Sequence, residues 1–563
     1  MSSEQAVQWP LPMGLETEYG ILGDIRNPIQ LSNLVVAAYK AAQGGMVAPW
    51  DHSGEDPLSD ARGFRLDRAA AHPSLLTDRP DGKAPDARGA LAAGPAESPA
   101  GRDATRGGGL PGTVGIVRLP KSAVYRAERD GPGAAMLANG ARLYVDHAHP
   151  EYAAPETATA REAALWDKAG ERVMAAAAAA LRDEGVRVAL YKNNADGHGA
   201  SYGTHENYLL PRSLRWETLV AGITPFLVTR QVFAGSGRVG LGVCSQEAGF
   251  QLSQRADYIE AEVGLETTLN RPIVNTRDEP HADPARWRRL HVIVGDATMM
   301  DVATYLRLGA TALVLRALAA VPPPDADRFA ASVALASPVA AFHQVSRDLS
   351  LREKLRLRSG GHATALEIQR RYRDFTLGAL GEATAGPGAS SGAVETAELQ
   401  RRWGEVLDGL EFDLWGVARQ VEWVAKLQVL DGMRRRGGLG WGSPKLRAAD
   451  LRWTDVGGEA SLFRRLDAAG AVERLFDEPD VIRAVVRPPA STRAYLRGET
   501  LRRFPMAVAA AGWDRLTVSW GDGAARIDLR DPLAGSRGAV GSLLAEAGSP
   551  RALADALSAA AGG

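Results

Sequence analysis

The sequence predicts a protein of the α+β class that ends in a small C-terminal domain. Residues 142–146 alternate between apolar and polar side chains, which is the period of a half-buried β-strand. Residues 162–184 are rich in alanine and end before a glycine, which is typical of a helix. Beyond the two prolines at 488–489 the pattern changes to short alternating helices and strands. We therefore expect one large domain at 1–489 and a small C-terminal domain at 490–563.

The other elements follow from the same rules of periodicity and helix-breaking residues. Further strands are expected at 13–22, 186–192, 200–210 and 288–295. Further helices are expected at 31–42, 214–232, 298–320 and over most of 395–434. Proline lacks the amide hydrogen that an inner helical turn requires, so Pro225 should interrupt the helix at 214–232.

The composition is that of a globular protein in which neither sign of charge dominates. Of the 563 residues, 45% are hydrophobic and 24% are charged, and the formal net charge is −1. This balance provides no overall field that would favour nucleic acid or an anionic membrane. Because Cys244 is the only cysteine, no internal disulfide can form, and a reducing compartment such as the cytoplasm is expected. The N-terminus lacks the pattern of a signal peptide, and we identify no apolar stretch long enough to span a bilayer.

The region 44–135 departs most from regular patterning. Residues 79–112 are rich in Gly, Pro, Ala and Arg, contain no aromatic residue and show no apolar period. We expect this segment to be a disordered insertion, because it offers little apolar surface to bury. Residues 50–66, in contrast, hold aromatic and oppositely charged side chains, and such a segment could order against a partner or against the site.

The most densely charged segment begins with the strand expected at 142–146. Leu143 and Val145 point to one face of that strand, which suits a protein core. The other face and the turn that follows carry ionisable side chains, namely Arg142, Tyr144, Asp146, His147, His149 and Glu151. A fold gains little by concentrating such groups unless they meet a ligand, a metal ion or each other. The alternatives are a loop held by ion pairs and a zinc site on the two histidines, although no partner cysteines follow.

Two further strands carry candidate ligands. Glu16 and Glu18 are two residues apart, so both carboxylates lie on one face of a strand, about 6.5 Å apart along the chain. This arrangement suits one or two hard cations, although an exposed edge strand with a polar face would show the same pattern. His205 and Asn207 share one face of the strand at 200–210, and a neutral histidine there can bind a metal ion or a phosphate. A structural role for a lone histidine is the alternative.

A fourth charged set precedes and enters the strand expected at 288–295. It contains Arg277, Arg288, Arg289 and His291. Guanidinium groups are suited to binding phosphate oxygens, so the three arginines are candidate nucleotide contacts. The chain has no Walker A loop and no G-x-G-x-x-G that opens a helix, so metal ions and arginines would have to hold any nucleotide. A loop held by ion pairs is the alternative.

Taken together, these segments resemble the Pup ligase family, whose members are Pup ligases and Pup deamidases/depupylases (the PafA/Dop family). The resemblance rests on blocks that follow in order over nearly the whole chain, among them GLETEYG at 14–20, NGARLYVDHAHPEY at 139–152, YKNNADGHGASYGTHENYL at 191–209, NTRDEPHAD at 275–283 and RRLHVIVGDA at 288–297. The block DHAHPE at 146–151 is similar to the hydrolase (Dop) branch, since the ligases carry a Gly-Ser variant after the aspartate. Residues 50–66 also resemble part of a loop that the ligases lack.

The resemblance implies a fold related to glutamine synthetase, with a curved, mostly antiparallel sheet backed by helices in the large, catalytic domain. It also implies ATP and Mg²⁺ as cofactors. By motif position, Asp146 resembles the catalytic aspartate and Arg142 an ATP contact, while Ala154 stands where the ligases carry a threonine that contacts ATP. The residues expected at the metal site are Glu16, Tyr144 and Glu151 from the resemblance, together with Glu18, His205 and His291 from the geometry of the motifs.

The expected function is ATP- and Mg²⁺-dependent hydrolysis of an amide of the C-terminal side chain of Pup. The protein would release Pup from substrate lysines (depupylase) and deamidate a C-terminal glutamine of Pup, since both substrates are amides of the same carboxyl group. The sequence leaves open whether Asp146 is the general base or the nucleophile, or whether phosphate formed from ATP attacks. Two alternatives are a Pup–protein ligase and a non-catalytic nucleotide-binding regulator.

Pup and pupylated proteins are the expected partners. Neither nucleic acid nor a membrane is expected as a partner, and a monomer is the expected state. Because Pup-like chains are acidic, the basic segments 352–358 and 434–436 are candidate contacts, with solvated helix faces as the alternative.

Overall fold

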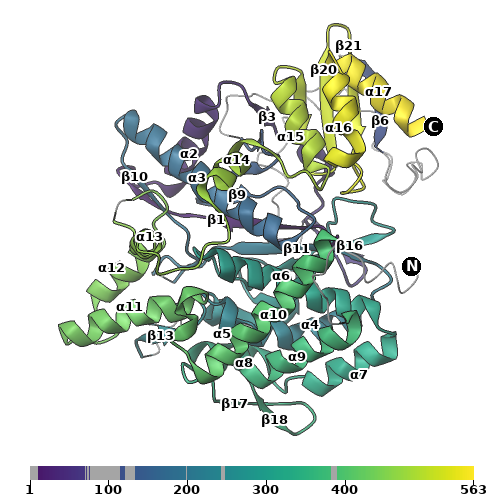
Figure 1. Ribbon diagram of the computed structural model, residues 1–563. Coiled ribbons are helices and arrows are strands. Elements are labelled where there is room, and N and C mark those ends of the chain that lie inside the picture. Colours follow the sequence, from purple (N-terminus) through teal and green to yellow (C-terminus); the bar gives the residue numbers. More distant parts are fainter. Residues whose placement is uncertain are drawn as a thin grey trace.

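The computed structural model describes residues 10–69, 71–72, 75, 114–120, 133–197, 199–241, 247–381, 390–458 and 460–562. The expected insertion at 79–112 and Cys244 lie outside these residues. Within them, helices and strands mix along the chain and a large antiparallel sheet lies at the centre (Figure 1). The prediction of an α+β fold with a mostly antiparallel sheet is therefore confirmed.

The central sheet has seven strands, and every neighbouring pair in it is antiparallel. Their order is β16 (Trp287–Val292), β11 (Thr204–Pro211), β1 (Met13–Glu18), β9 (His149–Ala153), β8 (Arg142–Asp146), β7 (Ala135–Leu137) and β3 (Val47–Pro49). Strand β8 has the bounds that side-chain alternation predicted. The strand expected at 13–22 is divided, because the chain leaves the sheet at Tyr19 and continues as β2 (Gly20–Gly23), which pairs with β10 (Val188–Tyr191).

One face of the sheet is covered by helices α2 (Pro28–Ala42), α3 (Ala160–Asp183) and α6 (Asp301–Ala320). Alternate side chains such as Leu15, Leu143 and Tyr152 enter this core and are almost completely buried. Gly170 of α3 lies against the ring of Tyr152, and a Cβ atom there would approach a ring carbon to 2.5 Å. Helix α3 can therefore approach the sheet closely only because it carries glycine at this position.

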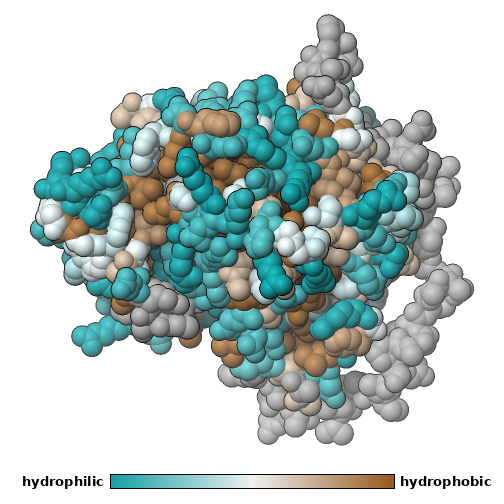
Figure 2. Space-filling view, turned by 90° about the horizontal axis from the view of Figure 1, so that it is seen from below, coloured by the Kyte–Doolittle hydropathy of each residue, from teal (hydrophilic) through white to brown (hydrophobic). Residues whose placement is uncertain are grey.

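The remaining helices form a second layer below the sheet (Figure 1). They are α4 (Trp216–Thr229), α5 (Gln231–Ala234), α7 (Pro323–Val333), α8 (Pro338–Arg347), α9 (Ala365–Leu380), α10 (Ser391–Phe412), α11 (Glu422–Gly437), α12 (Pro444–Trp453) and α13 (Leu462–Ala468). Helix α14 (Glu478–Val486) lies instead above the sheet, against α3. Further short pairs of strands are β4 (Ser59–Asp60) with β5 (Phe64–Arg65), β12 (Arg238–Gly240) with β13 (Gly249–Gln251), β14 (Ile259–Gly264) with β15 (Arg271–Asn275), and β17 (Lys354–Arg356) with β18 (His362–Thr364). The last pair connects α8 to α9. Seen from below, hydrophilic side chains cover much of this layer, with smaller hydrophobic patches between them (Figure 2).

Helix α4 continues through Pro225, so the predicted interruption is wrong. Two side-chain hydroxyl groups donate to backbone carbonyls of the turn that precedes the proline. Thr224 bonds the carbonyl of Val220 at 2.7 Å, and Tyr372 bonds the carbonyl of Gly222 at 2.6 Å. All residues from 222 to 229 are also buried, so packing around the helix outweighs the local cost of proline.

Helix α6 is apolar and long enough to cross a membrane by its length and composition, although the sequence reading identified no such stretch. In the fold, 94% of the apolar stretch of this helix is buried inside the protein. The helix packs against α3, α9 and α10 and contributes to the main apolar core. Its composition is therefore that of a core helix.

The C-terminal residues form a separate four-stranded sheet with its own apolar core (Figure 1). This unit contains β19 (Val508–Ala511), β20 (Arg515–Trp520), β21 (Gly523–Asp528), α15 (Ala494–Arg503), α16 (Arg537–Glu546) and α17 (Pro550–Gly562). Its fourth strand, β6 (Gly115–Pro120), comes from the region 44–135 and pairs with β21. Trp50 and Met136 pack into the same core. The domain boundary at 489 stays a prediction, because earlier segments of the chain contribute to this unit.

Candidate active site

The face of the central sheet opposite the helices collects most of the predicted site residues. Their alignment follows from strand register, because residues directly opposite each other on antiparallel strands point to the same face. Glu16 on β1 is opposite His205 on β11, and Glu18 is opposite Glu151 on β9. Further pairs on this face are Tyr144 with Glu151 and Asn207 with His291. Residues far apart in the sequence thus form one polar surface.

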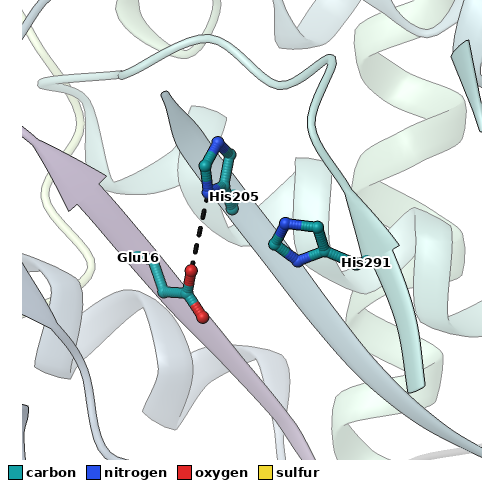
Figure 3. A group of neighbouring side chains, drawn as sticks. All are labelled: Glu16, His205 and His291. Carbon is teal, nitrogen blue, oxygen red and sulfur yellow. Dashed lines mark ion pairs between the residues drawn. The ribbon is translucent and has the colours of Figure 1, made fainter. Parts of the chain in front are cut away.

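The first cluster on this surface consists of Glu16, His205 and His291 from three adjacent strands (Figure 3). One potential ligand atom of each lies within 4.8 Å of those of the other two. The Nδ1 atom of His205 is 3.5 Å from Oε2 of Glu16, and the two imidazole rings are 4.9 Å apart. Burial alone would raise the pKa of Glu16, but the contact with His205 and the charge of Arg289 hold it below its usual value. Burial and the nearby Arg289 lower the pKa of His291 well below its ordinary value, so this imidazole is neutral.

The second cluster consists of three carboxylates, those of Glu18, Asp146 and Glu151, again within 4.8 Å of one another. Burial and the neighbouring carboxylates raise the pKa of Glu151 well above its usual value. Burial acts in the same direction on Asp146, but a contact of 3.0 Å with Nδ1 of His147 lowers the pKa of Asp146 overall. Three carboxyl groups at this spacing repel one another, and a cation among them removes that cost.

Both clusters have the donor chemistry of a metal site. The carboxylates suit a hard cation such as Mg²⁺, and neutral imidazole can complete a coordination shell. The buried Nδ1 atom of His149 has no hydrogen-bond partner among the described residues and lies 3.4 Å from Oε2 of Glu18. Burial and the charge of Glu151 raise the pKa of Tyr144, so its phenol remains protonated beside the acids. The residues present therefore fit two cations held side by side on the sheet.

The four candidate arginines do not all lie on this surface. Arg142 lies between the rings of Trp50 and Tyr144 and donates to Oε1 of Glu55 at 3.0 Å. Arg289 donates to Oδ1 of Asn207 at 3.1 Å.

The other two arginines come from a loop and from the reverse face of the sheet. Arg277 lies in the loop after β15, and its positive charge helps to lower the pKa of Asp146. Arg288 is on the opposite face of β16, where it donates to the carbonyl of Leu214 and lies over the ring of Trp216. The structure therefore does not support Arg288 as a nucleotide contact, because side chains alternate along a strand.

Residues 50–66 order against this edge of the site, as their composition allowed. The carboxylate of Glu55 accepts hydrogen bonds from Trp50 and Arg142. Burial would raise the pKa of Glu55, but His52 and Arg142 lower it to about 2. Asp60 accepts a hydrogen bond of 2.6 Å from Thr276, which fixes the segment beside Arg277.

A pocket that is partly open to solvent adjoins the first cluster on the side of the C-terminal unit. Its lining includes Glu16, Asn207, His281, Arg289, Arg493 and Trp513. The sequence reading did not identify Trp513 or His281 as site residues, because only the folded chain brings 281 and 513 together. His281 has a φ of +46°, and such backbone strain is often retained at a ligand site.

Comparison with known proteins identifies the family. The sequence model of the family described as Pup-ligase protein matches residues 12–517, and this chain belongs to that family. A relative from Mycobacterium tuberculosis (strain CDC 1551 / Oshkosh), named Pup deamidase/depupylase, is 45% identical over 541 residues, which are 94% of this chain and 96% of the relative.

Two solved structures of the ligase PafA share the fold. The complex between the prokaryotic ubiquitin-like protein Pup and PafA has a TM-score of 0.71 and 28% identity, over 97% of this chain and 93% of that one. PafA in complex with ADP has a TM-score of 0.65 and 33% identity, over 73% and 90% of the two chains.

Proposed function

We propose that this protein is a Pup deamidase/depupylase that hydrolyses amides of the side-chain carboxyl group at the C-terminus of Pup. The observation that carries the proposal is the near full-length similarity to a protein of that name, at 45% identity over 94% of the chain. Similarity to ligases is lower: the two PafA structures are 28% and 33% identical, and a relative named Pup--protein ligase is 40% identical over 72% of this chain. Removal of Pup from a lysine and deamidation of a C-terminal glutamine require the same bond cleavage, so one site serves both.

Asp146 is the residue to which we assign the attack on the amide carbon, either directly or through a water molecule that it deprotonates. Its side chain is 26% exposed, whereas Glu151 is buried, so within the carboxylate cluster a substrate reaches Asp146 more easily. The contact with His147 keeps the pKa of Asp146 low, and the carboxylate is therefore ionised at neutral pH. An ionised carboxylate is required for either role.

The two clusters are the proposed Mg²⁺ sites. The proposed ligands are Glu16, His205 and His291 of the first cluster, Glu18 and Glu151 of the second, and the adjacent Tyr144, while Asp146 of the second cluster is assigned to the chemistry. Bound Mg²⁺ would supply positive charge that polarises the amide carbonyl and neutralises the developing oxyanion. The protein's own contribution is to hold these ligands on rigid neighbouring strands. Their register fixes the spacing between the cations and Asp146.

ATP is the proposed nucleotide, and the cavity beside the first cluster is its proposed site. Trp513 and His281 offer ring faces for a base, and Glu16 lies at the boundary between cavity and metal cluster. Arg289, Arg142 and Arg277 are the cations available for phosphate oxygens. Arg142 is also the partner of Glu55, so residues 50–66 and the nucleotide share a contact.

Pup and pupylated proteins are the proposed partners, and the cytoplasm is the proposed compartment. The basic segment 352–358 contains β17, which Figure 1 shows at the lower edge of the molecule, below the helical layer. Arg434, Arg435 and Arg436 lie in the last turn of α11. Both segments stay candidate contacts for the acidic Pup chain.

Mass spectrometry of two parallel reactions tests the direction of the chemistry. With ATP and Mg²⁺, the protein should convert a C-terminal glutamine of Pup to glutamate. In the second reaction, Pup ending in glutamate is mixed with a lysine-bearing acceptor protein, and no net conjugate should accumulate. Net conjugation without deamidation would contradict the proposal and would favour a ligase.

A further inference from the structure

Asn207 on β11 lies between two members of the first cluster, Glu16 on β1 and His291 on β16. Its Nδ2 atom donates to Oε1 of Glu16 at 3.0 Å, and its Oδ1 atom is 2.9 Å from Nδ1 of His291. Arg289 donates to the same Oδ1 atom at 3.1 Å. Strand register brings these groups together, because Asn207 is directly opposite Gly14 on β1 and His291 on β16.

These contacts fix which way the amide of Asn207 faces. A guanidinium group can only donate, so the amide atom facing Arg289 has to be the oxygen. The amide nitrogen then faces the carboxylate of Glu16, which can accept. The reversed amide would place two donors against each other at Arg289 and two acceptors against each other at Glu16.

The orientation of Asn207 in turn determines where the proton of His291 lies. The Nδ1 atom of this histidine faces an oxygen that only accepts, so Nδ1 has to carry the hydrogen. In neutral imidazole the other ring nitrogen, Nε2, then has a free lone pair. Metal-binding histidines usually donate their second ring N–H group to such a partner, which fixes the tautomer and the ring orientation.

We propose that Asn207 is a positioning residue of the first metal cluster, and that it holds His291 with hydrogen on Nδ1 so that Nε2 binds the cation. The same amide leaves Oε2 of Glu16 for the cation and His205, because Oε1 is occupied. This inference rests on the metal site of the proposed function and adds a residue that acts only through the ligands.

Nitrogen NMR of histidine-labelled protein tests the tautomer directly. Protonated and unprotonated ring nitrogens differ in chemical shift, and a His291→Gln variant assigns the signal. In metal-free wild-type protein, His291 should carry hydrogen on Nδ1. In Asn207→Leu, the hydrogen should move towards Nε2. Asn207→Asp keeps an acceptor for His291 and should retain the Nδ1–H form. A wild-type His291 with hydrogen on Nε2 would overturn the inference even if no variant folds.

Binding of Mn²⁺ as a probe, followed by electron paramagnetic resonance, tests the consequence. Asn207→Leu should weaken the affinity roughly 10- to 100-fold, which is the range for loss of a partner of a metal ligand. Unchanged affinity would overturn the inference. Tyr208→Phe is the matched control, since Tyr208 is the next residue on β11, faces the core and bonds Glu206. Neither readout depends on Pup cleavage, so a wild type that binds Mn²⁺ but does not cleave Pup would contradict only the proposed function.

Discussion

Glu18 and Glu151 face each other directly across the neighbouring strands β1 and β9, and both side chains are buried. Asp146 completes this group, in which oxygen atoms of all three carboxylates lie within 4.8 Å of one another. Like charges directly opposite each other destabilise a sheet. The facing carboxylates of β1 and β9 are therefore stable only where protonation or a bound cation removes their repulsion.

Replacement of Glu151 by glutamine should therefore stabilise the metal-free protein. Because the pKa of Glu151 is raised in the folded state, the fold loses stability as pH rises above the ordinary pKa of a glutamate, and the loss is complete only once pH exceeds the raised value. Thermal unfolding in EDTA at about pH 8 should show Glu151→Gln to be more stable by about 1–3 kcal/mol. The gain should shrink at acidic pH.

Magnesium should reverse this order. The wild type should gain stability on addition of Mg²⁺ by mass action, whereas Glu151→Gln should gain less, because only the first cluster is left intact. Glu217→Gln is the control, because its carboxylate is exposed and belongs to neither cluster. Equal responses of wild type and Glu151→Gln to Mg²⁺ would be inconsistent with a cation at this group.

Local patterns predicted much of the sheet and most of the site. The alternation from Arg142 to Asp146 gave the bounds of β8, and E-x-E placed Glu16 and Glu18 on one face. The same rule could have separated Arg288 from Arg289, since neighbours on a strand point to opposite faces. Strand alternation also placed Asn207 on the same face as His205, and this shared face was the sequence feature that could have indicated a role for Asn207 at the metal site.

Local sequence patterns did not predict which distant segments of the chain pair with each other. Strand β6 pairs with β21 across about 400 residues of chain, and nothing in residues 115–120 specifies that partner. The arrangement of Trp513 and His281 around one cavity depends on the same kind of contact. Pro225 wrongly predicted a break in the helix, because tertiary packing around the buried residues of α4 compensates for the backbone hydrogen bond that proline removes.

Glu395 on α10 should make the stability of the fold depend on pH. Burial raises its pKa to about 7, and its Oε2 atom has no hydrogen-bond partner among the described residues. The folded state therefore binds more protons than the unfolded state between the ordinary pKa and about 7, and stability falls as pH rises through this window. Glu395→Gln should be more stable at about pH 8, by up to about 3 kcal/mol, and similar to the wild type near pH 4.

Thermal unfolding of both proteins over this pH range provides the check. Glutamine keeps an acceptor for the backbone N–H of Arg161, which Glu395 binds at 2.8 Å. A difference between the two proteins that stays constant with pH would show that Glu395 does not titrate in this window.

Glu156 should be essential for docking of the C-terminal unit. Its carboxylate binds Arg493 at 2.6 Å and Arg497 at 2.5 Å, and these arginines lower its pKa to about 2 against the effect of burial. Glu156→Gln leaves two buried cations without their partner and should destabilise the protein by about 3–5 kcal/mol, measured by chemical unfolding.

Glu499 offers a matched comparison, because it lies on α15, the helix that carries Arg497. Glu499 pairs with Arg487, whose side chain is 51% exposed, so Glu499→Gln should cost about 1 kcal/mol or less. Because Glu156 also lines the cavity, Glu156→Gln should weaken ADP binding, while Glu499→Gln should not. Equal stability of the two variants would refute the role of Glu156.

Cleavage of a Pup-linked model substrate by wild type and Asp146→Asn, with ATP and Mg²⁺, tests the central claim most directly. Asp325→Asn serves as the control, because Asp325 is exposed and belongs to an ion pair with Arg328 outside both clusters. The wild type and Asp325→Asn should release free Pup and the intact lysine protein, and chelation of Mg²⁺ should stop the release. Asp146→Asn should fold normally and release Pup roughly 10²- to 10⁴-fold more slowly. Release of Pup by Asp146→Asn at the wild-type rate would contradict the account.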